Sequence, residues 1–270
     1  MAKAVLEAEV EGVGKILGVD APFDEALASL KTEGVKYPIS ARDLAYSRIQ
    51  KGKRSSLSTN GSYTKEGFLY AKDSPVLVSL ASPLLNLGLA REATQANRNG
   101  SYFSTQDIQI YDKAMTQAEK DKNKSPEKRK VLILPSRNNF SISATENFDV
   151  LQGLLKDQAE KYLEFNGQDI PVYLVDKNTV DSQKGTLLTQ LWFRDLDSGS
   201  VLIGNGRNLD YSDRVRGVRV SGAEGTQKSF ESYNPKQVQQ YLSILEGVRQ
   251  GRLPASKLDK LITDFQGLKE

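Results

Sequence analysis

The chain has 270 residues with 37 Lys and Arg against 34 Asp and Glu, a formal net charge of +3, and no histidine or cysteine. Without these two residue types it cannot build a Ser-His-Asp triad, a thiolate nucleophile, a disulfide or a cysteine-ligated zinc site. A hydrophobic content of 38% is ordinary for a folded protein, so any chemistry must use carboxylates, hydroxyls, amides, lysines and arginines.

The N-terminal residues do not resemble a secretion signal. Glu7, Glu9 and Glu11 interrupt the stretch that a signal peptide would keep apolar. No apolar run reaches the roughly 20 residues that cross a bilayer, and the longest candidate, 75–80, has the length of a strand. We therefore expect a soluble, cytoplasmic protein with no membrane partner.

Helical signals come next. Asp20 followed by Pro22 predicts the start of a short helix, and Ser40 with Asp43 has the spacing of a helix N-cap. Ser82-Pro83 predicts a further helix that runs to about residue 96. Thr105 predicts the cap of another, whose apolar residues recur at helical spacing up to residue 118.

Two hairpins are expected between these helices. Asn60-Gly61, in the polar stretch 55–64, is typical of a type I′ turn. The ranges 68–71 and 76–80 read as strands joined by a turn that contains proline. The first part of the chain is therefore predicted to be helices around a small antiparallel sheet.

The segment 119–130 separates this part from the rest. It has six basic and three acidic residues and no apolar side chain, and both flanking parts are close to neutral. We interpret it as a charged linker or long loop, with a polyanion-binding arm as the alternative. The predicted parts are 1–118, the linker 119–130, and 131–270.

A βαβ unit is predicted after the linker. Residues 130–134 read as a buried strand, 145–165 as a helix and 170–175 as a second strand. This spacing is typical of a right-handed crossover between parallel strands.

The remaining elements are a hairpin, a strand and two helices. Residues 186–194 alternate in hydrophobicity and form a hairpin with 201–203, a short strand follows at 215–220, and helices are expected at 235–249 and 255–265. The predicted class is α+β, with N-terminal helices on a small antiparallel sheet and a C-terminal mixed sheet flanked by helices.

Two loops are candidate ligand sites because they follow the strands of the predicted βαβ unit. Arg137, Asn138 and Asn139 come after the first strand, and Asp176 and Lys177 after the second. Ligands gather beyond the carboxyl ends of parallel strands, so these side chains are expected to cradle a phosphate. The competing interpretation is that they only cap and turn the chain.

A second candidate is the densest arginine group. Arg207, Arg214 and Arg216 lie with Arg219 in a loop-rich stretch and its strand, and are expected to contact phosphates. Arginines that alternate with valines are also typical of a half-exposed strand. Asp195, Asp197 and Gly199 resemble part of a calcium loop but are better explained by a turn, so no resident metal is predicted.

The leading functional hypothesis is a non-catalytic binding or assembly protein for a phosphate-bearing ligand, with nucleic acid among the candidates. No cofactor is predicted. One alternative is a magnesium-dependent phosphoryl- or nucleotidyl-transfer enzyme or nuclease that uses aspartates such as Asp176 and Asp181. Another is a structural subunit of a homo-oligomer. Whether the protein is an enzyme is left open by the sequence.

Overall fold

The computed structural model describes residues 2–35, 37–143, 146–206 and 208–219, all within the first of two units of the chain, 1–221 and 222–270. The strands are β1 (Val5–Val10), β2 (Gly14–Asp20), β3 (Ser62–Tyr70), β4 (Leu77–Ser79), β5 (Ser104–Thr105), β6 (Val131–Ile133), β7 (Phe140–Ile142), β8 (Ile170–Tyr173), β9 (Thr186–Phe193), β10 (Leu202–Ile203) and β11 (Arg214–Arg219). The helices are α1 (Phe23–Thr32), α2 (Ala41–Lys51), α3 (Ser56–Thr59), α4 (Leu87–Arg98), α5 (Gln109–Asp121), α6 (Phe148–Leu155), α7 (Ala159–Asn166) and α8 (Lys177–Ser182), with the 3₁₀ turns η1 (Pro83–Leu85), η2 (Pro126–Lys128) and η3 (Lys156–Gln158). The predicted helices at 235–249 and 255–265 lie outside the described residues.

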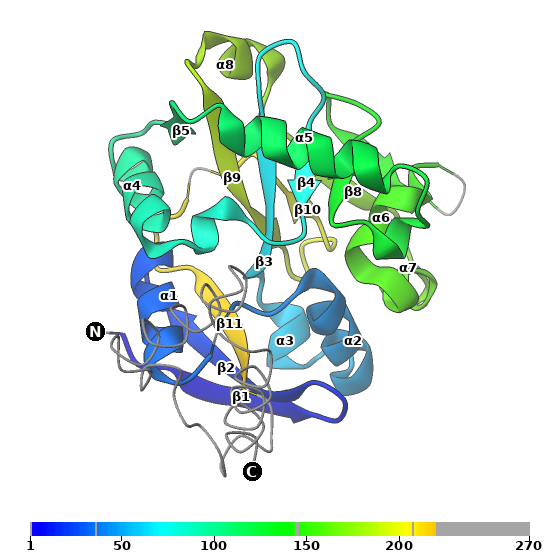
Figure 1. Ribbon diagram of the computed structural model, residues 1–270. Coiled ribbons are helices and arrows are strands. Elements are labelled where there is room, and N and C mark those ends of the chain that lie inside the picture. Colours follow the sequence, from blue (N-terminus) through cyan, green and yellow to red (C-terminus); the bar gives the residue numbers. More distant parts are fainter. Residues whose placement is uncertain (1, 36, 144–145, 207, 220–270) are drawn as a thin grey trace, which may run out of the picture. The chain divides into compact units, whose positions relative to one another are not determined.

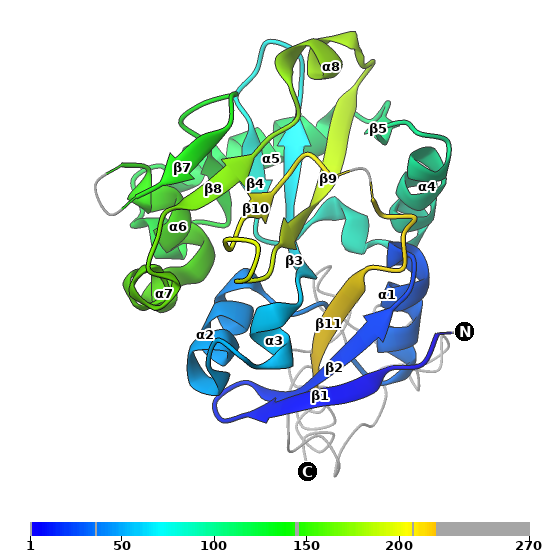
Figure 2. The same cartoon turned by 180° about the vertical axis from the view of Figure 1, so that it is seen from behind.

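In this part of the chain, eleven strands form one mixed sheet in the order β1-β2-β11-β3-β9-β10-β8-β7. β4 pairs with β3 and with β6, and β5 pairs with β9 (Figures 1 and 2). The antiparallel pair of β3 and β9 lies at the centre, and β11 connects it to the N-terminal hairpin of β1 and β2. Strands that precede and follow the segment 119–130 share this sheet. The predicted α+β class is confirmed.

Helices cover both faces of the sheet, and each face has its own core. Along β9, Leu187, Leu191 and Phe193 pack into the core that includes α2, α6 and α7. Leu188 and Trp192 pack into the core that includes α1, α4 and α5, which crosses the front of the sheet in Figure 1. The alternation predicted for this strand is confirmed, because successive side chains of a strand point to opposite faces.

Several local signals for helices and hairpins are confirmed. The Ser40 hydroxyl accepts a hydrogen bond from the Asp43 N–H at 3.0 Å and caps α2. Ser82 caps the turn η1 in the same way, and the predicted hairpins β3–β4 and β9–β10 are both present. The helix expected after Thr105 begins later, at Gln109, because Thr105 lies in β5 and pairs with β9. The N-terminal hairpin β1–β2 was not predicted.

The predicted parallel pairing of 130–134 with 170–175 is wrong. β6 instead pairs antiparallel with β4, with Leu77 opposite Ile133. β8 has β7 on one side and β10 on the other, so it has no free edge for β6. β7, a three-residue strand in the predicted loop, was too short to be read from hydrophobic pattern.

The long helix predicted at 145–165 is interrupted. α6 ends at Leu155, and Lys156 has φ 54° and ψ −125°, which no α-helix allows. The turn η3 follows and α7 then continues to Asn166, where Gly167 ends it in the left-handed conformation at φ 78°. The apolar stripe remains continuous across the break, which explains why its periodicity suggested one helix.

Two fully buried arginines donate hydrogen bonds to the backbone at 56–61. Arg48 donates to the carbonyl oxygens of Leu57 at 2.8 Å and Asn60 at 3.3 Å. Arg216 donates to the carbonyl oxygens of Asn60 at 3.2 Å and Gly61 at 2.9 Å. The Asn60 carbonyl is therefore shared by both guanidinium groups, and this backbone is satisfied by side chains rather than by a neighbouring strand.

The hairpin predicted at Asn60-Gly61 is accordingly wrong. Residues 56–59 form the short helix α3, and β3 begins directly afterwards at Ser62. Gly61 has another role here. A Cβ at this position would lie 2.3 Å from the Trp192 ring, so the glycine permits close packing of the indole.

Candidate functional site

The loops that follow β6 and β8 lie side by side, but their charges are paired with each other. The Arg137 guanidinium lies 3.5 Å from Asp181, and Lys177 contacts both Asp181 and Asp73. The hydrogen bond from Lys177 lowers the pKa of Asp181. Two cations thus face two carboxylates, which leaves no positive excess for a phosphate.

The other three residues of this predicted site form hydrogen bonds within the protein. Asp176 caps α8 by accepting a hydrogen bond from the Thr179 N–H at 2.8 Å. The Asn139 side chain accepts one from the Leu174 N–H at 2.6 Å, and the exposed Asn138 donates its N–H to Ser136 at 3.0 Å. The contacts of Asp176 and Asn138 fit the capping and turning role that was the competing interpretation, whereas that of Asn139 joins the two loops.

The arginines of β11 are also engaged by the protein itself, and Arg207 lies outside the described residues. Arg214 pairs with Glu7 at 3.2 Å and donates to Asp20 at 2.7 Å. Arg216 is fully buried and pairs with Glu7 at 2.7 Å, although the alternating pattern suggested a half-exposed strand. Burial lowers the pKa of Arg216, and Glu7 and the carbonyls at 56–61 compensate for its lost hydration.

Acidic side chains do not gather into a metal site. Among the described residues no three Asp or Glu side chains lie together as a metal ion requires. Asp195 accepts a hydrogen bond from the Ser198 N–H at 2.8 Å, as expected of the turn between β9 and β10. Asp181 contacts cations instead.

The charged segment 119–130 is a folded turn built on Asp121. The Asp121 carboxylate is fully buried and accepts hydrogen bonds from the Lys124 Nζ at 2.7 Å and the Lys130 N–H at 2.8 Å. These bonds lower the pKa of Asp121 to about 2. Arg129 donates to the Lys124 carbonyl at 3.0 Å, and η2 packs against α6 and η3.

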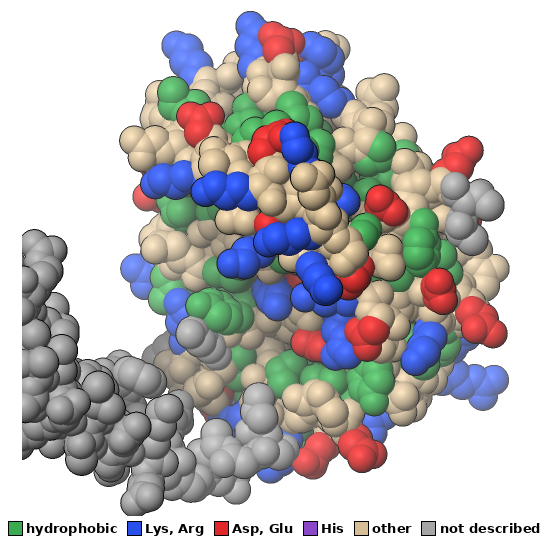
Figure 3. All heavy atoms as spheres, turned by 45° about the vertical axis from the view of Figure 1, so that its right-hand side comes forward, with side chains coloured by type: hydrophobic (Ala, Val, Ile, Leu, Met, Phe, Trp, Pro, Cys, Tyr) green, Lys and Arg blue, Asp and Glu red, His purple; other side chains and the backbone are tan. Residues whose placement is uncertain are grey.

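Basic side chains project outward from this turn. Lys120, Lys128 and Lys130 are exposed and form no ion pair in the part of the chain that the structure describes. Figure 3 shows lysine and arginine side chains gathering across the middle of this face. We call Lys120, Lys124, Lys128, Arg129 and Lys130 the basic ridge.

A cavity of about 430 Å³ opens close to the basic ridge, at the N-terminal end of α2. Leu80, which forms part of its wall, donates its N–H to the Lys130 carbonyl at 3.0 Å. The charged groups that line it come from α2, the middle of β3 and the start of η3: Arg42, Asp43, Lys65, Glu66, Lys156 and Asp157. Its volume lies within the range of small-molecule sites.

Glu66 is the buried titratable group of this cavity. A register shift in β3 between Tyr63 and Gly67 marks a bulge that places Glu66 against α2. Its carboxylate accepts a hydrogen bond from the Ala41 N–H at 3.0 Å, at the first turn of that helix. Burial nevertheless dominates and raises the pKa of Glu66 to about 7.

Sequence reasoning missed this cavity, although β3 carries a signal for the bulge. Lys65-Glu66-Gly67 places two charges and a glycine inside an otherwise strand-like run, and an internal glycine is typical of a bulge. That α2 and η3 complete the cavity follows only from the tertiary arrangement.

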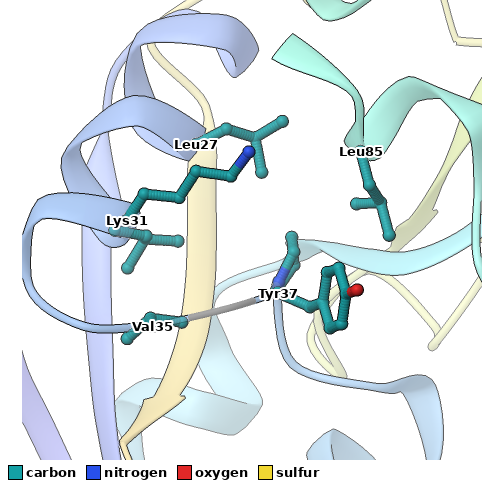
Figure 4. A pocket seen from close by; sticks show the side chains of 7 residues that line it. Leu27, Lys31, Val35, Tyr37 and Leu85 are labelled. Atoms are coloured by element: carbon teal, nitrogen blue, oxygen red, sulfur yellow. The ribbon is translucent and has the colours of Figure 1, made fainter. Parts of the chain in front are cut away.

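A second depression lies between α1 and η1. Figure 4 shows Leu27, Lys31, Val35, Tyr37 and Leu85 around it. It is apolar and leaves no room for a water molecule, so we do not regard it as a ligand site.

Comparison with known proteins identifies a similar fold but no family. No protein-family model matches the chain, and no curated protein matches it. One solved structure is similar over 78% of this chain and 100% of its own length, with a TM-score of 0.52 and 17% identity. That structure is described as "Accommodation of massive sequence variation in Nanoarchaeota by the C-type lectin fold". At this identity the likeness extends to the fold alone, which is that of a C-type lectin.

Proposed function

We propose that this protein is a non-catalytic binding protein for a phosphate-bearing polyanion such as nucleic acid, and that the basic ridge contacts it. The observation that carries the proposal is the set of exposed lysines without acidic partners on one folded turn of the described chain. Lysines that neutralise phosphates release counterions, which drives binding without any specific motif.

The pairing of the other cations supports this choice of surface. Arg137, Lys177, Arg214 and Arg216 all contact carboxylates of the same chain. A ligand phosphate would have to displace those partners. Lys120, Lys128 and Lys130 of the ridge make no such demand, because they are exposed and form no ion pair among the described residues.

The fold neighbour is consistent with a binding role. It is described as a case in which the fold accommodates massive sequence variation. A scaffold that tolerates variable side chains suits recognition better than a reaction centre, which requires fixed groups. The magnesium-dependent alternative has no comparable support, because the described aspartates do not gather.

The test is fluorescence anisotropy with a labelled single-stranded oligonucleotide between 50 and 300 mM salt. We expect the logarithm of affinity to fall linearly with the logarithm of salt concentration. Replacing Lys120, Lys128 and Lys130 together by Gln should reduce that slope by about 2, because each lost contact removes roughly 0.7.

The matched control replaces Lys31, Lys72 and Lys184 by Gln. These lysines are equally exposed and lie away from the ridge, so the control removes the same net charge. The proposal fails if the two triple variants lose affinity equally, or if wild-type binding does not depend on salt.

A further inference from the structure

The cavity at the N-terminal end of α2 is lined by three cations and three carboxyl groups. Arg42 contacts Asp43 at 2.9 Å and Asp157 at 2.9 Å, so one cation serves two carboxylates. Lys65 and Lys156 form no ion pair among the described residues. With Glu66 protonated, three cations face two carboxylates, and the surplus of one positive charge favours an anion.

Lys156 holds a backbone conformation that costs stability. Its φ of 54° with ψ of −125° lies in a region that only glycine adopts without strain. Glycine would end α6 equally well. The lysine therefore lowers stability while it places a cation on the wall of the cavity, a pattern typical of a functional position.

Glu66 sets the charge of the cavity through its protonation. Burial raises its pKa, and the hydrogen bond with the Thr64 side chain, the Lys65 charge and the hydrogen bond from the Ala41 N–H oppose that rise. On β9, Gln190 donates to the Glu66 carbonyl at 2.8 Å and is neutral. The remaining charged groups in the cavity wall are Arg42, Asp43, Lys156 and Asp157.

We propose that this cavity binds a small phosphomonoester, with Lys65 and Lys156 as the cations that neutralise its phosphate. This deepens the proposed function and rests on it, because the cavity would hold a terminal phosphate group beside the surface that holds the polyanion. A volume of about 430 Å³ exceeds what one phosphate fills, so part of the organic body also enters.

Binding is coupled to a proton on Glu66. An anion favours the neutral form of this carboxyl, so affinity rises as the pH falls from 8 to 6, through the pKa of the free protein. By linkage, the bound anion raises the pKa of Glu66 further. Above pH 7 the complex therefore takes up a proton that the free protein lacks.

The first experiment is calorimetric titration with adenosine 5′-monophosphate at pH 6.5. Lys156→Gly should weaken binding about tenfold or more, as expected for the loss of a charged contact, while its melting temperature stays equal to or above that of the wild type. Lys156→Arg keeps the charge and should bind like the wild type. Equal affinity of wild type and Lys156→Gly overturns the proposal.

The second experiment uses sulfate, whose charge does not change between pH 6 and 8. Wild-type affinity should be about fivefold higher at pH 6 than at pH 8, which corresponds to a rise of roughly one unit in the pKa of Glu66 on binding. Glu66→Gln mimics the protonated carboxyl and should bind equally at both pH values. A pH dependence that persists in Glu66→Gln contradicts the role of this residue.

The proposals for the basic ridge and for the cavity can be contradicted independently of each other. The Lys120, Lys128 and Lys130 triple variant keeps the cavity residues, so it should bind adenosine 5′-monophosphate with wild-type affinity. Oligonucleotide binding that depends on the ridge, without monophosphate binding, leaves the proposed function standing and removes the cavity. Loss of monophosphate binding in the triple variant contradicts a distinct cavity site.

Discussion

The arginines of β11 and the lysines of the basic ridge are both dense groups of cations, yet the fold uses them in opposite ways. Each described arginine of β11 contacts a carboxylate or a carbonyl of distant sequence, and Arg216 is fully buried. The ridge lysines lie on a turn whose one buried acid, Asp121, holds the backbone. Density of charge along a sequence therefore does not indicate whether that charge is available to a ligand.

The largest loss of stability should come from replacing the buried arginine of β11. Arg216→Met breaks the buried ion pair with Glu7, which keeps only Arg214, and removes the guanidinium that donates to the carbonyl oxygens of Asn60 and Gly61. Breaking a buried ion pair from one side costs about 3–5 kcal/mol. Urea unfolding measures this change.

The control for that prediction is Arg219→Met on the same strand. Arg219 is partly exposed and pairs with Glu33 at the surface, so its replacement should cost less than about 1 kcal/mol. Similar losses for the two variants would mean that burial of Arg216 has little energetic consequence.

Glu66 provides a contrast with Arg216, because both are buried but Glu66 forms no ion pair among the described residues. The pKa of Glu66 is about 7 in the folded state and 4.5 ordinarily. Between pH 4.5 and pH 7 the folded state therefore binds more protons than the unfolded state. The contribution of the Glu66 proton to the free energy of unfolding is fully present below pH 4.5. This contribution, about 3 kcal/mol, is lost as the pH rises through 7.

Glu66→Gln tests this sign. The variant should be more stable than the wild type by up to about 3 kcal/mol at pH 8 and nearly equal to it at pH 5. Urea unfolding at both pH values measures the difference. A stability gap that does not change with pH would show that the Glu66 carboxyl titrates normally.

The smallest effect is expected at the loops after β6 and β8. Lys177 contacts Asp73 and Asp181 at an exposed position, so Lys177→Gln should leave oligonucleotide affinity within twofold of the wild type. Anisotropy under the conditions used for the ridge measures it. A tenfold loss would identify these loops, rather than the ridge, as the phosphate site.

Features encoded within a few residues could be predicted. The cap at Ser40, the hairpin of β9 with β10 and the alternation along β9 depend on neighbours in sequence. The pairing of β6 with β4 depends on residues far apart in the chain, and so do the hydrogen bonds that buried arginines donate to the backbone at 56–61, such as that from Arg216 to Asn60. No short pattern encodes such pairs.

For the candidate site, the sequence correctly located clusters of charge but not their partners. Arg214 was predicted to contact phosphate, and in the structure it forms ion pairs with Asp20 and Glu7, which lie near the other end of the described chain. The ridge segment 119–130 was recognised as charged, with polyanion binding as an alternative to a linker. Glu66 was missed because its burial depends on three elements that meet around it.

By itself the sequence determined the α+β class, the caps and the absence of histidine and cysteine chemistry, because propensity and residue chemistry act locally. Only the tertiary structure decided which strands pair, which cations are neutralised and where a cavity forms. Those outcomes depend on contacts between distant segments, and the burial that such contacts create decides whether a charge is paired, protonated or left for a ligand.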